Sequence, residues 1–188
     1  MSYKDKTLIF ESNKIYYNDA DNSIEMEVMM DWEDTVMKKS ADYVCQNGGD
    51  ILEIGFGMGI AANYMQANSI TSHTIVENHP QIIEKAKAWA SGKSNVTVVE
   101  GDWYAVKDSL STYDGIFYDT FGDENMDKFK DSLANLTKSG SKVTWWNSVS
   151  SESNYYNING VTYEAIAVSP PSNCYFNHNT YYLPKKEF

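Results

Sequence analysis

The chain contains no arginine, since all 15 of its basic residues are lysines, and 26 acidic residues give it a net charge of −11. Without arginine, no side chain grips a phosphate or a carboxylate through two parallel hydrogen bonds. Neutralised phosphates supply most of the affinity for nucleic acid, so we expect no nucleic-acid partner. A cationic small molecule suits the sign of the charge better.

Long apolar runs and cysteines are also scarce. No run of about 18 apolar residues occurs, so we expect no membrane-spanning helix. The first residues lead into no apolar segment of the kind found in secretory signal peptides, so we expect no such signal. The two cysteines, Cys45 and Cys174, lack metal-ligand spacing, as do His73, His79 and His178. We therefore expect a cytoplasmic protein with two free thiols and no metal.

The remaining pattern predicts an α/β fold. With 188 residues and 14% aromatic residues, the chain is long enough to bury a core, and we expect one domain over 1–188. Within it, residues 1–27 are expected to form an irregular, lid-like segment. Strand-like and helix-like runs alternate from about 51 to 146, which is typical of a doubly wound, mostly parallel, Rossmann-like sheet. Two β-rich runs, 161–168 and 174–183, predict an antiparallel edge at its end.

The segment DILEIGFGMGIAANY, residues 50–64, is the most informative part of the chain. A buried strand runs into glycines at positions 55, 57 and 59 and then into a helix, which lets the backbone approach a nucleotide-like cofactor. A dinucleotide loop has glycine or alanine at the sixth position of the motif, where this chain has Ile60. The turn therefore favours S-adenosylmethionine, which has no pyrophosphate. The alternative is a plain tight turn in another α/β protein.

Polar and aromatic residues follow the ends of the other predicted strands, where ligands lie in such sheets. Glu77, about 20 residues after the first glycine of the turn, is placed to accept hydrogen bonds from both ribose hydroxyls. Asp102 can accept from an adenine amino group, and Trp103 can either stack on the ring or pack in the core. Asp119 follows the strand predicted at 115–118 and places a carboxylate beside the methyl group of the cofactor.

A second carboxylate comes earlier, in a helix predicted over residues 29–45. At helical spacing, Glu33 shares one stripe with Met29 and Met37, which lie four residues away on either side. A carboxylate between two methionines is expected to form part of a pocket wall. The alternative is an ordinary solvated helical glutamate.

Three segments together resemble one enzyme family: VMMDWE at 28–33, LEIGFGMGI at 52–60 and YDGIFYDTF at 113–121. They closely resemble guanidinoacetate N-methyltransferase and its relative, the fungal-type protein-arginine δ-N-methyltransferase. The tail SPPSNCYF at 169–176 is similar to the ending of the first, and YLP at 182–184 to that of the second. The chain departs from the first enzyme in a shorter leader and in lacking a long insertion, both of which thin the lid over the acceptor.

The resemblance implies which residues form the site. Glu33 and Asp119 would be the catalytic carboxylates that grip a guanidinium. The S-adenosylmethionine site would be formed by Met29, Met37, Gly55, Phe56, Gly57, Met58, Gly59, Ile60, Glu77, Asp102, Trp103 and Asp119. The backbone N–H groups of the segment after the fifth parallel strand would bind the carboxylate of the acceptor, at Asn147, Ser148 and Val149.

Two carboxylates suit methyl transfer to a guanidinium, because its forked donors let them fix its rotation and Asp119 can take the released proton. We expect an S-adenosylmethionine-dependent N-methyltransferase that acts on a small-molecule guanidino substrate and releases S-adenosylhomocysteine. Guanidinoacetate is the leading acceptor, giving creatine. The alternatives are arginine, free or in a protein, as the acceptor, a non-catalytic S-adenosylmethionine-binding module, and an enzyme that degrades the cofactor.

Overall fold

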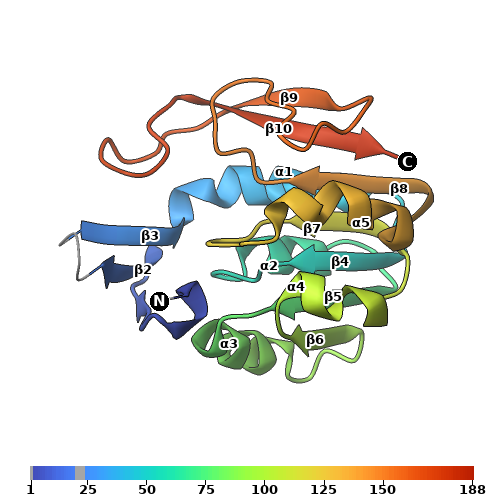
Figure 1. Cartoon of the computed structure of the whole chain (residues 1–188), viewed down its shortest axis with the longest axis horizontal. Helices are drawn as coiled ribbons and strands as arrows, with labels where there is room; N and C mark the ends of the chain where they lie inside the picture. Colours follow the sequence, from blue (N-terminus) through green and yellow to red (C-terminus); the bar gives the residue numbers. More distant parts are fainter. Residues whose placement is uncertain (1, 20–23) are drawn as a thin grey trace.

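A seven-stranded sheet forms the centre of the protein, as a computed structural model of residues 2–19 and 24–188 describes it (Figure 1). Its strands follow the spatial order β6-β5-β4-β7-β8-β10-β9. Their bounds are β4 (Asp50–Ile54), β5 (Ser72–Glu77), β6 (Val96–Glu100), β7 (Tyr113–Tyr118), β8 (Thr137–Trp145), β9 (Thr162–Ala167) and β10 (Thr180–Glu187). The first five in this order are parallel, whereas β10 runs antiparallel to β8 and β9. This confirms the predicted Rossmann-like sheet with an antiparallel edge.

Strand β4 lies at the point where the winding of the sheet changes direction. It pairs with β5 on one side and with β7 on the other, and residues 51–54 are all buried. Both faces of such a central parallel strand are covered by helices, which explains its apolar sequence. Ligands of doubly wound sheets bind beyond the carboxyl ends of the strands at this point.

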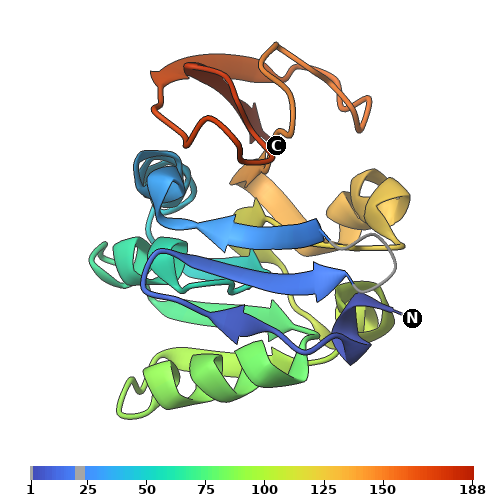
Figure 2. The ribbon, with the colours of Figure 1, turned by 90° about the vertical axis from the view of Figure 1, so that its left-hand side faces the viewer.

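Helices cover both faces of the sheet. Their bounds are α1 (Asp34–Val44), α2 (Ile60–Gln66), α3 (Pro80–Ala90), α4 (Trp103–Val106) and α5 (Phe129–Leu136), with 3₁₀ turns η1 (Tyr3–Asp5), η2 (Asp31–Glu33), η3 (Lys107–Ser109) and η4 (Met126–Lys128). Figure 2 shows α1 and α2 on one side of the sheet and α5 on the other. Accordingly, Ile51 packs with the apolar residues of α1 and α2, while its neighbour Leu52 packs with those of α5. In the described ranges, none of the helices combines the length and hydrophobicity that crossing a bilayer requires.

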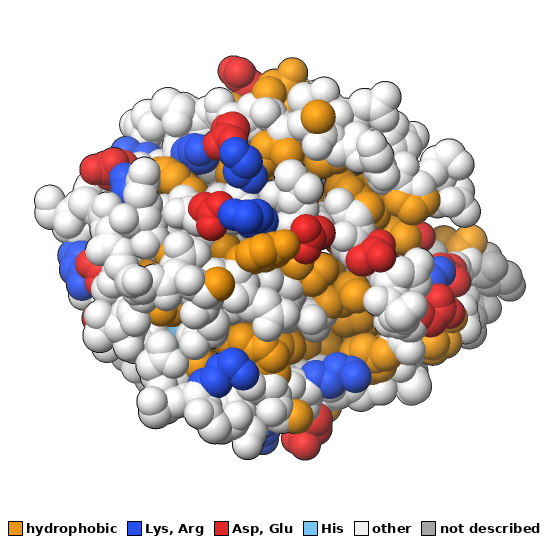
Figure 3. Space-filling view, turned by 180° about the vertical axis from the view of Figure 1, so that it is seen from behind, with side chains coloured by type: hydrophobic (Ala, Val, Ile, Leu, Met, Phe, Trp, Pro, Cys, Tyr) orange, Lys and Arg blue, Asp and Glu red, His pale blue; other side chains and the backbone are white. Residues whose placement is uncertain are grey.

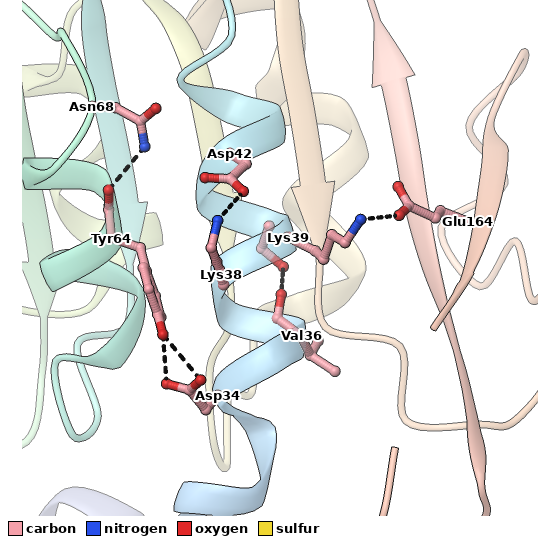
Figure 4. Close-up of polar contacts among 9 residues, drawn as sticks. Asp34, Val36, Lys38, Lys39, Asp42, Tyr64, Asn68 and Glu164 are labelled. Atoms are coloured by element: carbon pink, nitrogen blue, oxygen red, sulfur yellow. Dashed lines mark hydrogen bonds and ion pairs between the residues drawn. The ribbon is translucent and has the colours of Figure 1, made fainter. Parts of the chain in front are cut away.

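Polar contacts on the outer side of α1 fix this helix to its neighbours (Figure 4). The Tyr64 hydroxyl of α2 lies 2.9 Å from both carboxylate oxygens of Asp34, and Lys39 Nζ lies 2.8 Å from Glu164 Oε1 on β9. Acidic and basic side chains also lie side by side on the face opposite that of Figure 1, next to a band of apolar ones (Figure 3). Because η2 leads directly into α1, these contacts also help to place Glu33.

A small antiparallel sheet crosses the carboxyl ends of the central strands (Figure 2). It comprises β1 (Ile9–Phe10), β2 (Lys14–Asp19) and β3 (Ile24–Met30). The prediction of an irregular segment over 1–27 is therefore wrong for its described part, while residues 1 and 20–23 lie outside the described residues. Pairing across the sheet gave these polar residues a strand structure that their weak apolar pattern did not indicate.

Two further predicted elements need correction. The helix predicted from Met29 begins only at Asp34, because Met29 and Met30 end β3 and pair with β2. The last β-rich run was expected over 174–183, but β10 begins at Thr180 and the residues before it form a loop. In both places, pairing with a strand distant in the sequence determines where the element begins, and the local apolar pattern does not.

Candidate active site

The first candidate site is a cleft of about 680 Å³ at the carboxyl ends of β4, β5 and β7, here called the glycine cleft. The predicted residues that line it are Met29, Met37, Gly55, Phe56, Gly57, Glu77, Trp103 and Asp119. The described residues that line the cleft do not include Met58, Gly59, Ile60 or Asp102. The cleft therefore collects eight of the twelve residues that the sequence assigned to the cofactor.

The glycines of the turn allow a close approach of backbones. Gly55 has φ +93°, and a Cβ added there would lie 1.8 Å from the carbonyl oxygen of Asp119. A Cβ on Gly57, at φ +54°, would lie 2.3 Å from the Met29 sulfur. The third glycine, Gly59 at φ +74°, is the N-cap of α2 and lies behind the cleft wall. At Gly55 only glycine fits without a shift of the backbone, whereas at Gly57 the obstacle is the Met29 side chain and the positive φ itself favours glycine.

Glu77 ties the glycine turn to the end of β5. Its side chain is buried, and its carboxylate accepts hydrogen bonds from the backbone N–H of Phe56 at 2.9 Å and from those of Asn78 and His79 at 2.8 Å. Burial raises the pKa of this carboxyl, and the three N–H donors oppose the rise. The carboxylate thus holds the turn in place while it lines the cleft.

Asp102 has a different contact from the one predicted. Its Oδ1 accepts from the N–H groups of Tyr104 at 2.9 Å and Ala105 at 3.1 Å, so the carboxylate caps the N-terminus of α4. This is a frequent role of aspartate before a helix, and it turns the carboxylate away from the cleft. Trp103 does line the cleft and is buried.

Asp123 is a residue of the cleft wall that the sequence analysis missed. Its Oδ2 accepts from Trp103 Nε1 at 2.6 Å, from Thr120 Oγ1 at 3.2 Å and from the Tyr118 hydroxyl. The carboxylate therefore fixes the indole ring and the loop after β7 together. The only local signal was its place in the loop after the strand that ends in Tyr118.

A second cavity of about 1280 Å³ adjoins the first and is here called the aromatic pocket. Its aromatic wall consists of Tyr118, Phe121, Trp145, Trp146, Tyr155, Tyr156 and Tyr175. The predicted acceptor residues Glu33, Asp119, Asn147, Ser148 and Val149 all line it as well. Asp119 belongs to the walls of both cavities, so it stands where they meet. The paired aromatics at 145–146 and 155–156 were the sequence signal for this wall.

Glu33 reaches the aromatic pocket by a route that differs from the prediction. Met29 lies on strand β3, so the expected helical stripe of Met29, Glu33 and Met37 does not exist. Instead, the 3₁₀ turn η2 directs the side chain inward, where only 3% of the residue is exposed. Its Oε1 accepts from the backbone N–H of Met30 at 2.8 Å and from the hydroxyl of Tyr175.

The two carboxylates lie in surroundings that disfavour their charge. Burial, followed by the nearby Asp119, raises the pKa of Glu33 to about 8. Burial, followed by Glu53, raises the pKa of Asp119 to about 7. No lysine is found among the described residues that line either cavity. A cation between these carboxylates would favour the ionised form of both, so the arrangement is suited to a positively charged ligand.

The backbone N–H groups expected to bind an acceptor carboxylate are largely used within the chain. The N–H of Asn147 donates to the Tyr181 hydroxyl at 2.7 Å, and that of Val149 points to Asn147 Oδ1 at 3.4 Å. Their predicted role stays a prediction, in which a bound acceptor carboxylate would have to replace these partners. Ser148 lines the pocket between them.

The chain is similar in sequence to known proteins. Residues 3–153 match the family model described as guanidinoacetate N-methyltransferase. The chain is 35% identical over 136 residues to Protein arginine N-methyltransferase 2 of Yarrowia lipolytica, which covers 66% of this chain and 28% of that protein. The same-named protein of Saccharomyces cerevisiae is 36% identical over 139 residues, covering 68% of this chain and 31% of that protein. The chain thus spans about a third of the length of these curated relatives.

Solved structures share the fold at low identity. Precorrin-6y C5,15-methyltransferase of Geobacter metallireducens has a TM-score of 0.63 at 15% identity, covering 80% of this chain and 87% of that one. Spermidine synthase of Thermotoga maritima has a TM-score of 0.63 at 9% identity, covering 96% of this chain and 72% of that one. At these identities the likeness concerns the fold alone.

The fold and the glycine cleft have the form found in S-adenosylmethionine-dependent methyltransferases. The residues present fit this cofactor, because the cleft combines a glycine turn, a buried carboxylate at the end of β5 and an indole ring. Within this class, the chain belongs to the guanidinoacetate N-methyltransferase family.

Proposed function

We propose that the protein methylates a guanidino nitrogen. The observation that carries the proposal is the position of Asp119, a carboxylate in the wall between the glycine cleft and the aromatic pocket. Glu33 supplies a second buried carboxylate to the same pocket. A planar cation with donors along its edges matches two such acceptors better than an ammonium does.

The two carboxylates orient the acceptor and handle its proton. Bound in the glycine cleft, S-adenosylmethionine would supply a methyl group from its positively charged sulfur to the acceptor nitrogen, leaving the uncharged thioether of S-adenosylhomocysteine. Glu33 and Asp119 accept from the edges of the guanidinium and fix its rotation, and orientation of this kind supplies roughly 7–11 kcal/mol in favourable cases. Asp119 takes the proton that the nitrogen loses, and the burial that raises the pKa of its carboxyl makes it a better proton acceptor.

The acceptor we propose first is an arginine side chain in a peptide or protein. The aromatic pocket opens to solvent beside the exposed side chains of Val149 and Tyr155, so an acceptor larger than free guanidinoacetate can enter it. The N–H groups of Asn147 and Val149 already have partners, which weakens the case for a cradle around a free carboxylate. The relatives are named as protein arginine N-methyltransferases. This reverses the order of the two acceptors expected from the sequence.

Guanidinoacetate is the second candidate, with creatine as the product. The match of residues 3–153 to the family model that carries its name supports it. Ser148, at the pocket wall, would then meet the carboxylate of this small acceptor. The two candidates share Glu33 and Asp119 and differ only in what lies at the mouth of the pocket.

The test is a competition between three acceptors with S-adenosylmethionine: an arginine-bearing peptide, free arginine and guanidinoacetate. Methylated products and S-adenosylhomocysteine are followed by mass spectrometry. We expect the peptide to be methylated at the highest kcat/KM. Creatine as the main product would make guanidinoacetate the acceptor.

Two other results would overturn the proposal. Cofactor binding without turnover of any guanidino compound would point to a non-catalytic module, and loss of S-adenosylmethionine without an acceptor to a degrading enzyme. A Glu33→Gln variant serves as the control for the site. It is expected to bind S-adenosylmethionine normally and to lose most turnover, because the amide cannot balance the guanidinium charge.

A further inference from the structure

Tyr175 occupies an unusual position in the loop between β9 and β10. Tyr175 is 45% exposed, yet its hydroxyl reaches the buried carboxylate of Glu33. The ring packs between Trp32 and Trp146, with centroids 6.0 and 6.2 Å away, and the backbone N–H donates to Glu27 Oε2 at 3.1 Å. The loop is thus held at two points against β3 and the turn that follows it.

We propose that Tyr175 is a positioning residue for Glu33. Its hydroxyl and the N–H of Met30 both donate to Glu33 Oε1, and this orients Oε2 to accept from the guanidino acceptor. This inference rests on the proposed function. It gives the loop between β9 and β10 a role in the aromatic pocket.

The hydrogen bonds at Glu33 explain how this works. Met30 N–H and the Tyr175 hydroxyl both donate to Oε1, whereas Oε2 accepts no bond from the part of the chain that the structure describes. Two donors on one oxygen fix the rotation of a carboxylate, because turning it would leave both donors without a partner. A donor to a carboxylate also favours its charged form, the form that a guanidinium needs.

The other titratable groups near Glu33 act in the opposite direction. Asp119 faces it from the end of β7, Cys174 from the same loop as Tyr175, and Tyr181 from β10. A negative charge on any of them disfavours the charge on Glu33. Burial raises the pKa of Tyr181 and that of Cys174, so both are neutral at pH 7 and Asp119 is the main opponent. The hydrogen bonds that Tyr175 and the N–H of Met30 donate to Glu33 offset the effect of Asp119 on its charge.

The first test compares the pH dependence of kcat/KM for the guanidino acceptor in the unmodified protein and in Tyr175→Phe. We expect the acid limb of the Tyr175→Phe profile to lie about one pH unit higher, so that kcat/KM at pH 7 is about tenfold lower. Most of this loss should be recovered at alkaline pH, where Glu33 is ionised in both proteins. Tyr16→Phe is the matched control, since it removes the 3.0 Å hydrogen bond that the hydroxyl of Tyr16, on β2, donates to the exposed Glu11.

Two outcomes of this test would overturn the inference. A loss in Tyr175→Phe that is equal at every pH would mean that the tyrosine only supports the fold. A gain in kcat/KM would mean that its hydroxyl competes with the acceptor for Glu33.

The second test needs no turnover and separates the two proposals. Protein labelled with ¹³C at the glutamate carboxyl carbons is titrated by NMR with S-adenosylhomocysteine bound, and Glu33→Gln identifies the Glu33 signal. We expect Tyr175→Phe to raise the Glu33 pKa by about one unit and Tyr16→Phe to leave it unchanged. An unchanged Glu33 in Tyr175→Phe would overturn the inference. If Glu33 responds but no guanidino compound is methylated, only the proposed function fails.

Discussion

The two cavities of the site are built in different ways. The glycine cleft takes its wall mainly from the ends of neighbouring parallel strands and the turns that follow them, at 53–57, 76–78, 101, 103, 117, 119–121 and 123. The aromatic pocket combines residues of 26–33, 118–126, 145–156 and Tyr175. Its parts come from the small sheet, the main sheet and a loop near the end of the chain. A cleft made of strand ends follows from the fold, whereas the pocket depends on segments that meet only after folding.

Asp119 connects the two cavities through both its backbone and its side chain. Its backbone N–H donates to Ile54 O at 2.9 Å, and its carbonyl lies where a Cβ on Gly55 would be. Its carboxylate lines both walls. Substitutions at the two cavities therefore show whether cofactor binding and acceptor chemistry separate at this residue.

Asp119→Asn should have the largest effect and should separate the two functions. The amide cannot take the proton of the acceptor or balance its charge, so we expect kcat/KM to fall about 10³-fold, or about 4 kcal/mol. The Kd for S-adenosylmethionine should stay close to the unmodified value. Steady-state kinetics and isothermal titration calorimetry measure the two quantities.

The control for this variant is Asp127→Asn, on the exposed part of the same connection, where the carboxylate pairs with Lys128 in solvent. It should leave both quantities unchanged. If the cofactor Kd of Asp119→Asn rises in step with the loss of turnover, the two cavities are one functional unit and the comparison fails.

The difference between the cavities explains what the sequence predicted. The strand–turn–helix at β4, the carboxylate at the end of β5 and Asp119 after β7 follow from apolar runs and the residues that end them, and the structure places all three in the glycine cleft. The parallel sheet follows from the same alternation. Asp102 is the exception, because local capping of α4 decided the direction of its side chain.

For the aromatic pocket, local patterns indicated single residues such as Glu33 and Asp119, and only the family resemblance brought them together in one site. Glu33 enters it from a turn after β3, whereas the periodicity indicated a helix that includes Met29. Tyr175 comes from a loop that the apolar pattern indicated as a strand, and its contact with Glu33 spans most of the chain. The N–H of Asn147 is taken by Tyr181, a partner on another strand. No local pattern encodes contacts of such sequence separation.

Gly55→Ala should weaken both cavities at once. Its Cβ would lie 1.8 Å from the carbonyl of Asp119, and φ is +93°, so we expect a loss of about 3 kcal/mol in the free energy of unfolding. The matched control is Gly92→Ala, at φ +82° with nothing within 4 Å of the added Cβ, where backbone strain alone costs about 1 kcal/mol. Urea denaturation measures both. Equal losses in the two variants would show that the contact with Asp119 is unimportant.

Glu77→Gln should affect only the glycine cleft. The amide cannot replace a carboxylate that accepts from three backbone N–H groups, so we expect the cofactor Kd to rise about 30-fold, or about 2 kcal/mol. At saturating cofactor the KM of the acceptor should not change. Glu100→Gln is the control, because Glu100 ends the neighbouring strand β6 in register with Glu77 but is exposed and pairs with Lys87 at 2.7 Å. An equal rise in both variants would remove Glu77 from the site.

The smallest effect concerns stability and charge in the aromatic pocket. The pKa of Glu33 is about 8 in the folded protein and about 4.3 in an unfolded chain. Between these values the folded protein keeps a proton that the unfolded chain has released, so stability falls as the pH rises from about 4 to about 8. Glu33→Gln cannot ionise, and its oxygen can still accept from Met30 and Tyr175.

We therefore expect Glu33→Gln to gain stability relative to the unmodified protein as the pH rises from 5 to 8.5, because only the unmodified protein must then hold a charge in the pocket. Urea denaturation at the two pH values measures this difference. An equal difference at both pH values would mean that ionisation of Glu33 costs the fold nothing. A gain confined to high pH would mean that the same buried charge that suits the pocket to a guanidinium lowers the stability of the fold while no cation is bound.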